Sequence, residues 1–295
     1  MTPAEDPTSW VHHNGAIVPV DEAALPVSSM AVRYGLLAFE GVRAYRGHDA
    51  SMRPWLLAEH LVRLRESCSA LGLEAKCCDD VPDAVNEVLD ANGVTRDCYV
   101  LVTVSAAGQV DTPRPYRSML TVAVASTGHR KWMASGEGMS IAIRHIARPG
   151  ERTGVTPVHE LSIYARRRLA LTEVRARGYD DAALLNDHGL VMGSTSAALF
   201  IVENGVLITS PTEDAGVPSI LRSWVMKTAP EFGLEVRAEA VPADRLRAAT
   251  EVFICGTGVE FACVRTIDDV QLPGWPRYST TTLLSDEMFA QARAA

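Results

Sequence analysis

Apolar positions recur along part of the chain at three- and four-residue spacing, which is the period of an amphipathic helix. Residues 59–71 carry such a pattern and are followed by Gly72, a residue type that commonly ends helices. Residues 161–174 repeat the pattern before Gly178. We therefore predict two helices, each burying one apolar face and each ending at a glycine.

Other segments have the composition of strands. Runs rich in β-branched and apolar residues at 98–104 and 118–124 are bounded by polar or proline-containing segments. Residues 182–185 form a third such run. Asn-Gly pairs at 14–15 and 204–205 lie between apolar runs and are strong signals for tight hairpin turns. The chain therefore mixes α and β structure.

The length of 295 residues predicts two domains, each long enough to bury its own core. We expect an N-terminal α/β domain at 1–125, a glycine-containing linker at 126–138 and a C-terminal domain at 139–295. Within the last, residues 218–233 are predicted as a helix and residues 234–241 as a returning strand.

Composition and charge exclude several classes of protein. With 47% apolar and 22% charged residues the chain is too apolar to be disordered, and its net charge of −8 without basic runs argues against a nucleic-acid partner. No apolar run approaches the roughly 20 residues that span a bilayer. The six cysteines are unevenly spread and have no metal-ligand spacing. We expect a cytoplasmic protein with reduced thiols, no membrane association and no metal.

Six short motifs follow one another along nearly the whole chain: Arg33-Tyr34-Gly35, Phe39-Glu40-Gly41-Val42-Arg43-Ala44-Tyr45, His60-Leu61-Val62-Arg63-Leu64, Gly178-Tyr179-Asp180, Asn204-Gly205-Val206-Leu207 and Cys255-Gly256-Thr257-Gly258-Val259-Glu260. In this order they resemble class IV (fold type IV) aminotransferases, a family that includes branched-chain aminotransferases and aminodeoxychorismate lyase. The resemblance implies a D-amino-acid aminotransferase-like α/β (α+β) fold with a smaller N-terminal α/β domain and a larger β-rich C-terminal domain. It also implies an active site between the domains, and a homodimer.

The residue that should bind the cofactor covalently departs from the family pattern. The family requires a lysine, five residues before a tyrosine, that forms a Schiff base with pyridoxal phosphate (PLP). Here Tyr164 matches the tyrosine, and His159 stands at the position of the lysine. An imidazole cannot form that imine. The lysines of the chain are Lys76, Lys131 and Lys227, and none of them falls at that position.

Two further cofactor contacts also depart from the pattern. Gly193 stands where the family has a glutamate against the pyridine nitrogen, and Ala198 replaces a nearby asparagine. Leu221 replaces the threonine of a phosphate-binding turn. Arg63 and Thr257, which match phosphate contacts, are retained. These departures predict that the protein works without PLP.

The candidate chemistry then rests on acid/base groups and anion binding. His159 exchanges protons near neutral pH, and Tyr164 is expected beside it. Arg63, Thr257 and Gly256 are expected to hold an anionic group. Alternatives remain open: a decayed position for the histidine, a tyrosine satisfied within the core, and an ordinary ion pair for the arginine.

Other positions are weaker candidates for a substrate pocket. Tyr34 and Arg43 match pocket motifs, whereas Leu101 stands where branched-chain enzymes tend to carry a carboxylate-binding arginine. In the predicted linker, His129 could supply a proton and Lys131 an anion contact. A solvated pair is the alternative for both linker residues.

A run of small polar residues at 193–196 offers further donors. Ser194 and Thr195 could present hydroxyl and amide groups to an anion. An ordinary turn is the alternative, because glycine, serine and threonine are common turn residues.

The sequence therefore leads to three hypotheses about function. The first is a PLP-independent enzyme that isomerises, eliminates or cyclises a small anionic metabolite, in the setting of a biosynthetic pathway, with no cofactor. The second is a non-catalytic protein that binds a ligand or a partner. The third is a residual aminotransferase that holds PLP or pyridoxamine phosphate (PMP) noncovalently.

Overall fold

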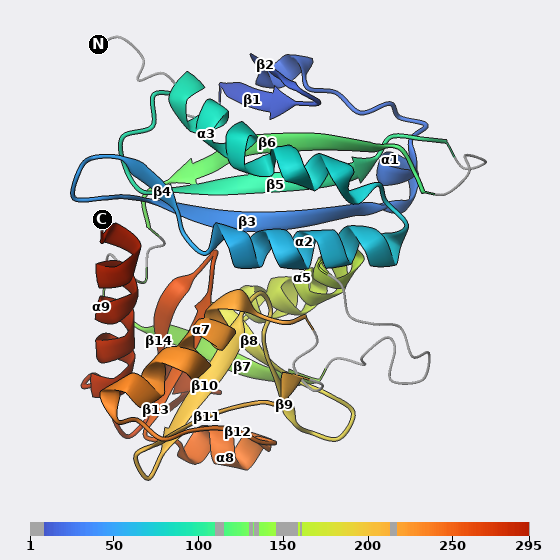
Figure 1. Cartoon of the computed structure of the whole chain (residues 1–295). Coiled ribbons are helices and arrows are strands. Elements are labelled where there is room, and N and C mark those ends of the chain that lie inside the picture. Colours follow the sequence, from blue (N-terminus) through green and yellow to red (C-terminus); the bar gives the residue numbers. More distant parts are fainter. Residues whose placement is uncertain are drawn as a thin grey trace. The chain divides into compact units, whose positions relative to one another are not determined.

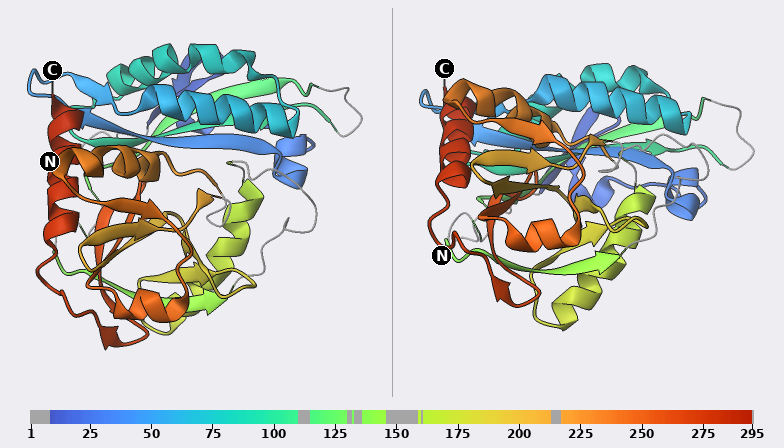
Figure 2. Two further views of the ribbon diagram at one scale, coloured as in Figure 1. Left: turned by 60° about the horizontal axis from the view of Figure 1, so that its bottom comes forward. Right: turned by 90° about the horizontal axis from the view of Figure 1, so that it is seen from below.

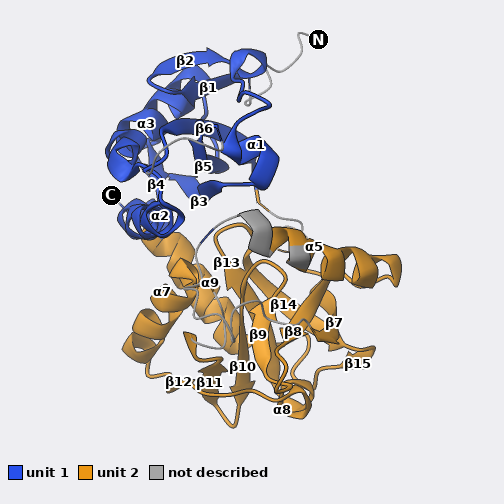
Figure 3. Cartoon of the chain, turned by 90° about the vertical axis from the view of Figure 1, so that its right-hand side faces the viewer, with its two compact units in different colours: residues 1–128, 158–163, 292–295 blue, residues 129–157, 164–291 orange. Residues whose placement is uncertain are grey.

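The computed structural model divides into two compact units (Figure 3). Unit 1 comprises residues 1–128, 158–163 and 292–295, and unit 2 comprises residues 129–157 and 164–291. The structure describes residues 9–109, 115–129, 132, 136–145, 159, 161–212 and 217–294.

Unit 1 is built on a six-stranded antiparallel sheet with the order β2-β1-β6-β5-β3-β4 (Figure 1). The long strands β3 and β5 pair from Leu37 opposite Ser105 to Ala44 opposite Cys98. The strands are β1 (Trp10–His13), β2 (Ala16–Pro19), β3 (Leu37–Arg46), β4 (Met52–Pro54), β5 (Cys98–Ala106) and β6 (Ser118–Thr127).

Two helices cover one face of this sheet. Apolar residues of α2 (Leu57–Leu71) and α3 (Val81–Ala91) share one core with the sheet residues Ala38 and Val42. Glu40 lies between Ala38 and Val42 on β3. Because side chains alternate along a strand, all three point to the same face of the sheet, and Glu40 enters the layer between the sheet and the helices. A carboxylate in a core needs charged or hydrogen-bonding partners. The remaining elements are α1 (Met30–Tyr34) and the short 3-10 helices η1 (Val20–Glu22) and η2 (Ala75–Asp80).

Unit 2 is built on a nine-stranded mixed sheet with the order β12-β11-β10-β13-β14-β7-β8-β9, with β15 paired to β14. Strands from both ends of this order contribute to one core, for example Val191 of β9 and Ile208 of β11. The sheet therefore curls around that core (Figure 2). The strands are β7 (Met139–His145), β8 (Asp181–Leu185), β9 (Val191–Ser194), β10 (Ala198–Glu203), β11 (Val206–Thr209), β12 (Val236–Ala238), β13 (Glu251–Gly256), β14 (Glu260–Ile267) and β15 (Val270–Gln271).

Helices pack against this sheet at several places. Helix α5 (Leu161–Ala176) packs Ala170 and Val174 against β7 and β8. It lies on the face of these strands that points away from the curled core. The other helices are α7 (Ile220–Thr228), η3 (Ala229–Phe232), α8 (Ala243–Ala248) and α9 (Ser279–Arg293). None of the helices in the described part of the chain is long and apolar enough to cross a membrane.

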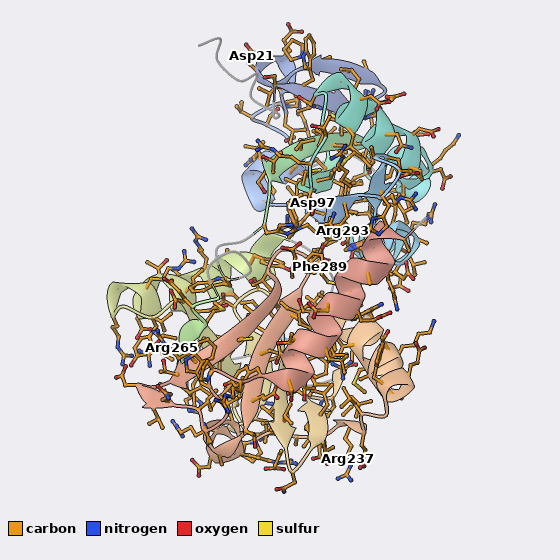
Figure 4. The ribbon with its side chains drawn as sticks, turned by 90° about the vertical axis from the view of Figure 1, so that its left-hand side faces the viewer. Asp21, Asp97, Arg237, Arg265, Phe289 and Arg293 are labelled. Atoms are coloured by element: carbon orange, nitrogen blue, oxygen red, sulfur yellow. The ribbon has the colours of Figure 1, made fainter. Side chains whose placement is uncertain are left out.

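The last residues of the chain are held in unit 1 by an ion pair. Arg293 donates to both carboxylate oxygens of Asp97 (Figure 4). It also donates to the carbonyl of Arg46, and its guanidinium lies 5.8 Å from the ring centroid of Tyr45. The side chain of Asp97 is nearly buried, so this pair is a fixed contact of the unit.

Most local predictions are confirmed. Both Asn-Gly hairpins form, between β1 and β2 and between β10 and β11. The helix predicted over 59–71 is α2, and Gly72 ends it in the left-handed conformation with φ of 71°. The predicted helix over 161–174 is α5, but it buries Ala170 and Val174 and leaves Leu169, a position of the predicted apolar face, 73% exposed. The strand predictions at 98–104, 118–124 and 182–185 correspond to β5, β6 and β8.

Two predictions near the end of the chain are wrong. The helix predicted over 218–233 stops at Thr228 and continues as η3, because Pro230 has no N–H to donate to the preceding turn. The strand predicted over 234–241 is only β12, three residues long. It lies at the end of the sheet order, and edge strands are commonly short.

Candidate functional site

A buried ion pair between Glu40 and Arg63 forms the centre of the polar cluster in unit 1. Arg63 donates from Nε to Oε1 of Glu40 and from Nη2 to Oε2, both at 2.7 Å. His60 adds a donor, with Nδ1 2.6 Å from Oε2. His60 and Arg63 are three residues apart on α2 and so share one face of the helix. Both oxygens of a carboxylate that is only 1% exposed are thereby satisfied.

His159 is bound to the same cluster through its main chain and its ring. Its N–H donates to Oγ of Ser67 at 3.1 Å, and its carbonyl accepts from the N–H of Phe39 at 3.3 Å. Its ring lies 4.3 Å from the ring of Phe39, and its Nδ1 donates to the carbonyl oxygen of Phe39. Because a carbonyl oxygen only accepts, Nδ1 carries the hydrogen. In the neutral ring Nε2 then holds the lone pair.

Burial and neighbouring charges decide the protonation states in this cluster. Burial alone would raise the pKa of Glu40, but hydrogen bonds from Arg63 and His60 and the charge of Arg63 outweigh it and hold that pKa at about 2. Burial lowers the pKa of His159 to about 4, against the opposing effect of Glu40, whose Oε1 lies 3.5 Å from Nδ1. At neutral pH the cluster therefore contains an ionised carboxylate, a guanidinium and a neutral His159.

In unit 2 a second polar cluster surrounds the turn between β9 and β10. Oδ1 of Asp181 accepts from Oγ1 of Thr195 at 2.5 Å and from the N–H of Ala182 at 2.7 Å. Oγ of Ser194 accepts from the N–H groups of Ser196 and Ala197. Burial raises the pKa of Asp181, in opposition to the hydrogen bonds that it accepts. The hydroxyl groups of Ser194 and Thr195 therefore form hydrogen bonds that stabilise the turn.

Gly193 occupies a position in this turn that has no room for a side chain. Its φ of +130° is one that L-residues rarely adopt, and an added Cβ would lie 2.8 Å from the carbonyl oxygen of Ala197. Gly256, at the end of β13, approaches the same turn, and its Cβ would lie 2.9 Å from Cβ of Ala197. In this conformation position 193 cannot carry the glutamate that the family pattern has there.

The pocket residues predicted in unit 1 have different environments. Arg43 is buried, donates from Nη1 to the carbonyl of Gly128 at 2.6 Å and lies 5.7 Å from the ring centroid of Tyr99. Tyr34 is 58% exposed at the end of α1. The structure therefore fixes Arg43 within the unit and leaves Tyr34 largely in contact with solvent.

The remaining predicted residues belong to unit 2 or lie outside the described residues. Nδ1 of His129 is 2.9 Å from both carboxylate oxygens of Glu260, a buried residue with a φ of +61°. Thr257 is half-buried directly after β13, and Tyr164 is half-buried on α5. Lys131 lies outside the described residues. The structure thus joins Arg63 with His159 in unit 1, whereas Thr257 and Tyr164 belong to unit 2.

Sequence reasoning missed the carboxylates on which both clusters depend. Glu40 stands in a matching motif but was given no role, although His60 and Arg63 at i and i+3 on a helix indicate a shared partner. Asp181 and Glu260 were missed as well. Their partners are 14 and 131 residues away in the chain, and no short-range pattern contains that information.

The two sheets, the curled β-rich second unit and these clusters define a two-unit α/β protein of fold type IV. The sequence model of the amino-transferase class IV family matches residues 37–267, and the chain belongs to that family. A branched-chain-amino-acid aminotransferase of Salmonella typhimurium is 30% identical over 268 residues, covering 89% of this chain and 86% of that protein.

Solved structures of branched-chain aminotransferases are also similar to this chain. The crystal structure of the Escherichia coli branched-chain amino acid aminotransferase is similar with a TM-score of 0.89 and 26% identity, covering 96% of this chain and 94% of that one. The branched-chain aminotransferase of Thermoproteus uzoniensis with norvaline has a TM-score of 0.88 and 28% identity, covering 97% and 95%.

The prediction that no cofactor is involved is wrong. Among the similar structures, one branched-chain amino acid aminotransferase is described with pyridoxamine 5'-phosphate, and it covers 97% of this chain with 27% identity and a TM-score of 0.89. The enzyme from Thermobaculum terrenum is described in its PLP form. The loss of some cofactor contacts in the sequence therefore does not imply the loss of the cofactor.

We predict that acid destabilises the protein through His159. The unfolded chain protonates this residue below about pH 6.5 and the folded chain only below about pH 4, so the unfolded state binds more protons between these values. The free energy of unfolding should fall by roughly 3 kcal/mol as the pH falls from 6.5 to 4. Urea denaturation across this range should show the loss in the wild type and in the exposed control His188→Gln. An equal loss in His159→Gln would contradict the assignment.

We also predict that position 193 rejects even a methyl group. Gly193→Ala should lower the free energy of unfolding by about 3 kcal/mol, because it adds a steric overlap to the backbone strain. Gly189 also has a positive φ but open space around it, so Gly189→Ala should cost only about 1 kcal/mol. Equal costs in denaturation experiments would show that the overlap with Ala197 is relieved without penalty.

Proposed function

We propose that this chain is a class IV aminotransferase-like enzyme that binds PLP or PMP noncovalently and acts on a small anionic amino or keto acid. The observation that carries the proposal is the identity and setting of residue 159. It is a buried, neutral histidine bound to the Glu40–Arg63 cluster, at the position where the family pattern has the lysine. Lys76 and Lys227 lie elsewhere, on η2 and at the end of α7.

The residues present fit the phosphate end of such a cofactor better than its other contacts. Arg63 carries a guanidinium whose orientation Glu40 fixes with two hydrogen bonds, and Thr257 retains its hydroxyl. Gly256 lets the main chain after β13 approach the turn at Ala197 closely. Position 193 lacks a carboxylate and His159 cannot form an imine. The donor set therefore supports an anchor through the phosphate group.

The chain's own residues then have defined roles in this proposal. In unit 2, Thr257 and Gly256 bind the phosphate group, and in unit 1 Arg63 offers its guanidinium to an anionic group. His159 accepts or releases a proton at Nε2, because its Nδ1–H is held by the carbonyl of Phe39. Glu40 fixes the guanidinium of Arg63. When bound, the cofactor supplies an amino-group carrier and an electron-withdrawing ring. We expect a homodimer, as the family resemblance implies.

The test is binding of PLP and of PMP to the purified protein, followed by absorbance and equilibrium dialysis. Both should bind stoichiometrically and be removed by dialysis, because no covalent bond holds them. Borohydride treatment should leave no adduct by mass spectrometry, whereas His159→Lys should gain one. Thr257→Ala should bind at least about tenfold more weakly through loss of a phosphate contact, and Thr172→Ala, on the exposed face of α5, should bind normally.

Turnover is tested on the PMP-loaded protein with a panel of keto acids. We expect conversion of PMP to PLP in a single turnover, slowed about a hundredfold in His159→Gln because a proton carrier is lost. Absence of binding for both cofactors would refute the proposal and favour a ligand-binding protein without turnover. A borohydride adduct on a lysine of the wild type would refute the noncovalent anchor.

A further inference from the structure

Two of the six cysteines face each other in the core of unit 1. Cys68, on α2, and Cys78, on η2, are both fully buried, and their Sγ atoms are 4.0 Å apart. Cys77, the residue before Cys78, is half-buried, and its thiol donates to the carbonyl of Glu74 at 3.4 Å. The thiol contact in this part of the core is thus the one between Cys68 and Cys78.

The turn that follows α2 holds these thiols together. Gly72 ends the helix in the left-handed conformation, and the N–H of Leu73 donates back to the carbonyl of Cys68 at 2.8 Å. The chain then continues into η2, and this short helix places Cys78 next to Cys68 of α2. The two cysteines of unit 2 each lie opposite a phenylalanine of the neighbouring strand. Cys255 of β13 is opposite Phe261 of β14, and Cys263 of β14 is opposite Phe253 of β13.

The chemistry of the site favours oxidation over metal binding. Among the residues that the structure describes, no group of three His, Cys, Asp or Glu side chains is arranged to hold a metal ion. Hydrogen bonding with the thiol of Cys68 and burial raise the pKa of Cys78 to about 12, so the sulfur of Cys78 is protonated at neutral pH. Metal binding would require buried thiolates. A disulfide is uncharged and suits an apolar core.

We propose that Cys68 and Cys78 form an oxidation-sensitive modification site whose stable product is a buried disulfide between them. Peroxide oxidises the thiol of Cys78 to a sulfenic acid and releases water. The thiol of Cys68, whose Sγ lies 4.0 Å from that of Cys78, then displaces a second water and forms the disulfide. In sum two thiols and one peroxide give one disulfide and two waters.

The site lies next to the candidate functional cluster but does not depend on the proposed function. Cys68 follows Ser67, whose hydroxyl accepts the N–H of His159 at 3.1 Å. The same helix carries His60 and Arg63. A disulfide would therefore tie η2 to the helix that organises this cluster.

The experiment treats the reduced full-length protein with hydrogen peroxide, blocks the remaining thiols by alkylation and maps tryptic peptides without reduction. Cleavage after Lys76 separates Cys68 from Cys77 and Cys78. We expect one linked peptide pair, reversed by dithiothreitol. Its formation should be at least about tenfold faster at pH 9 than at pH 7, because the thiolate is the reactive form.

Variants test the pair. Cys78→Ser and Cys78→Ala should give no linked pair. Cys77→Ser should form the pair at about the wild-type rate, because Cys77 takes no part in it, and the half-buried control Cys263→Ser should behave as wild type. A wild type that oxidises elsewhere without forming the linked pair would overturn the site, and loss of the pair in Cys77→Ser would overturn the assignment of the bond to Cys78.

Discussion

The buried carboxylate of Glu40 is the constraint on which the candidate site of unit 1 depends. A charge in the layer between a sheet and a helix costs several kcal/mol unless it is paired. Arg63 and His60 supply that pairing from one face of α2, and Ser67 of the same helix binds the main chain at His159. The need to neutralise one carboxylate therefore constrains how α2 lies on β3, while Ser67 of that helix and Phe39 of that strand hold residue 159.

Burial and the contact with Phe39 explain why His159 is suited to a role that differs from that of a lysine. Burial keeps its ring neutral, and the carbonyl of Phe39 holds the hydrogen on Nδ1. The nitrogen that remains able to accept a proton is Nε2. Such a group can move a proton but cannot bind a cofactor covalently, which is why the proposed anchor rests on the phosphate contacts.

Local signals predicted much of the fold, and pairings between distant residues could not be predicted. The helix at 59–71 follows from its apolar spacing and from Gly72, which are both local features. The end of α7 depends on Pro230, a signal that is present in the sequence but was not weighed. The motifs identified Arg63 and His159, whereas the pairing of Glu40 with a helix about twenty residues later has no signal in periodicity. The cofactor was misjudged because the lost contacts were given more weight than the retained phosphate contacts.

The most direct test of this account is a titration of His159 by nitrogen-15 NMR on protein with labelled histidine, assigned by comparison with His159→Gln. The account predicts a neutral ring with hydrogen on Nδ1 at pH 7 and protonation only near pH 4. Hydrogen on Nε2, or a pKa at or above 6.5, would contradict it, because the ring would then be neither held by Phe39 nor kept neutral by burial.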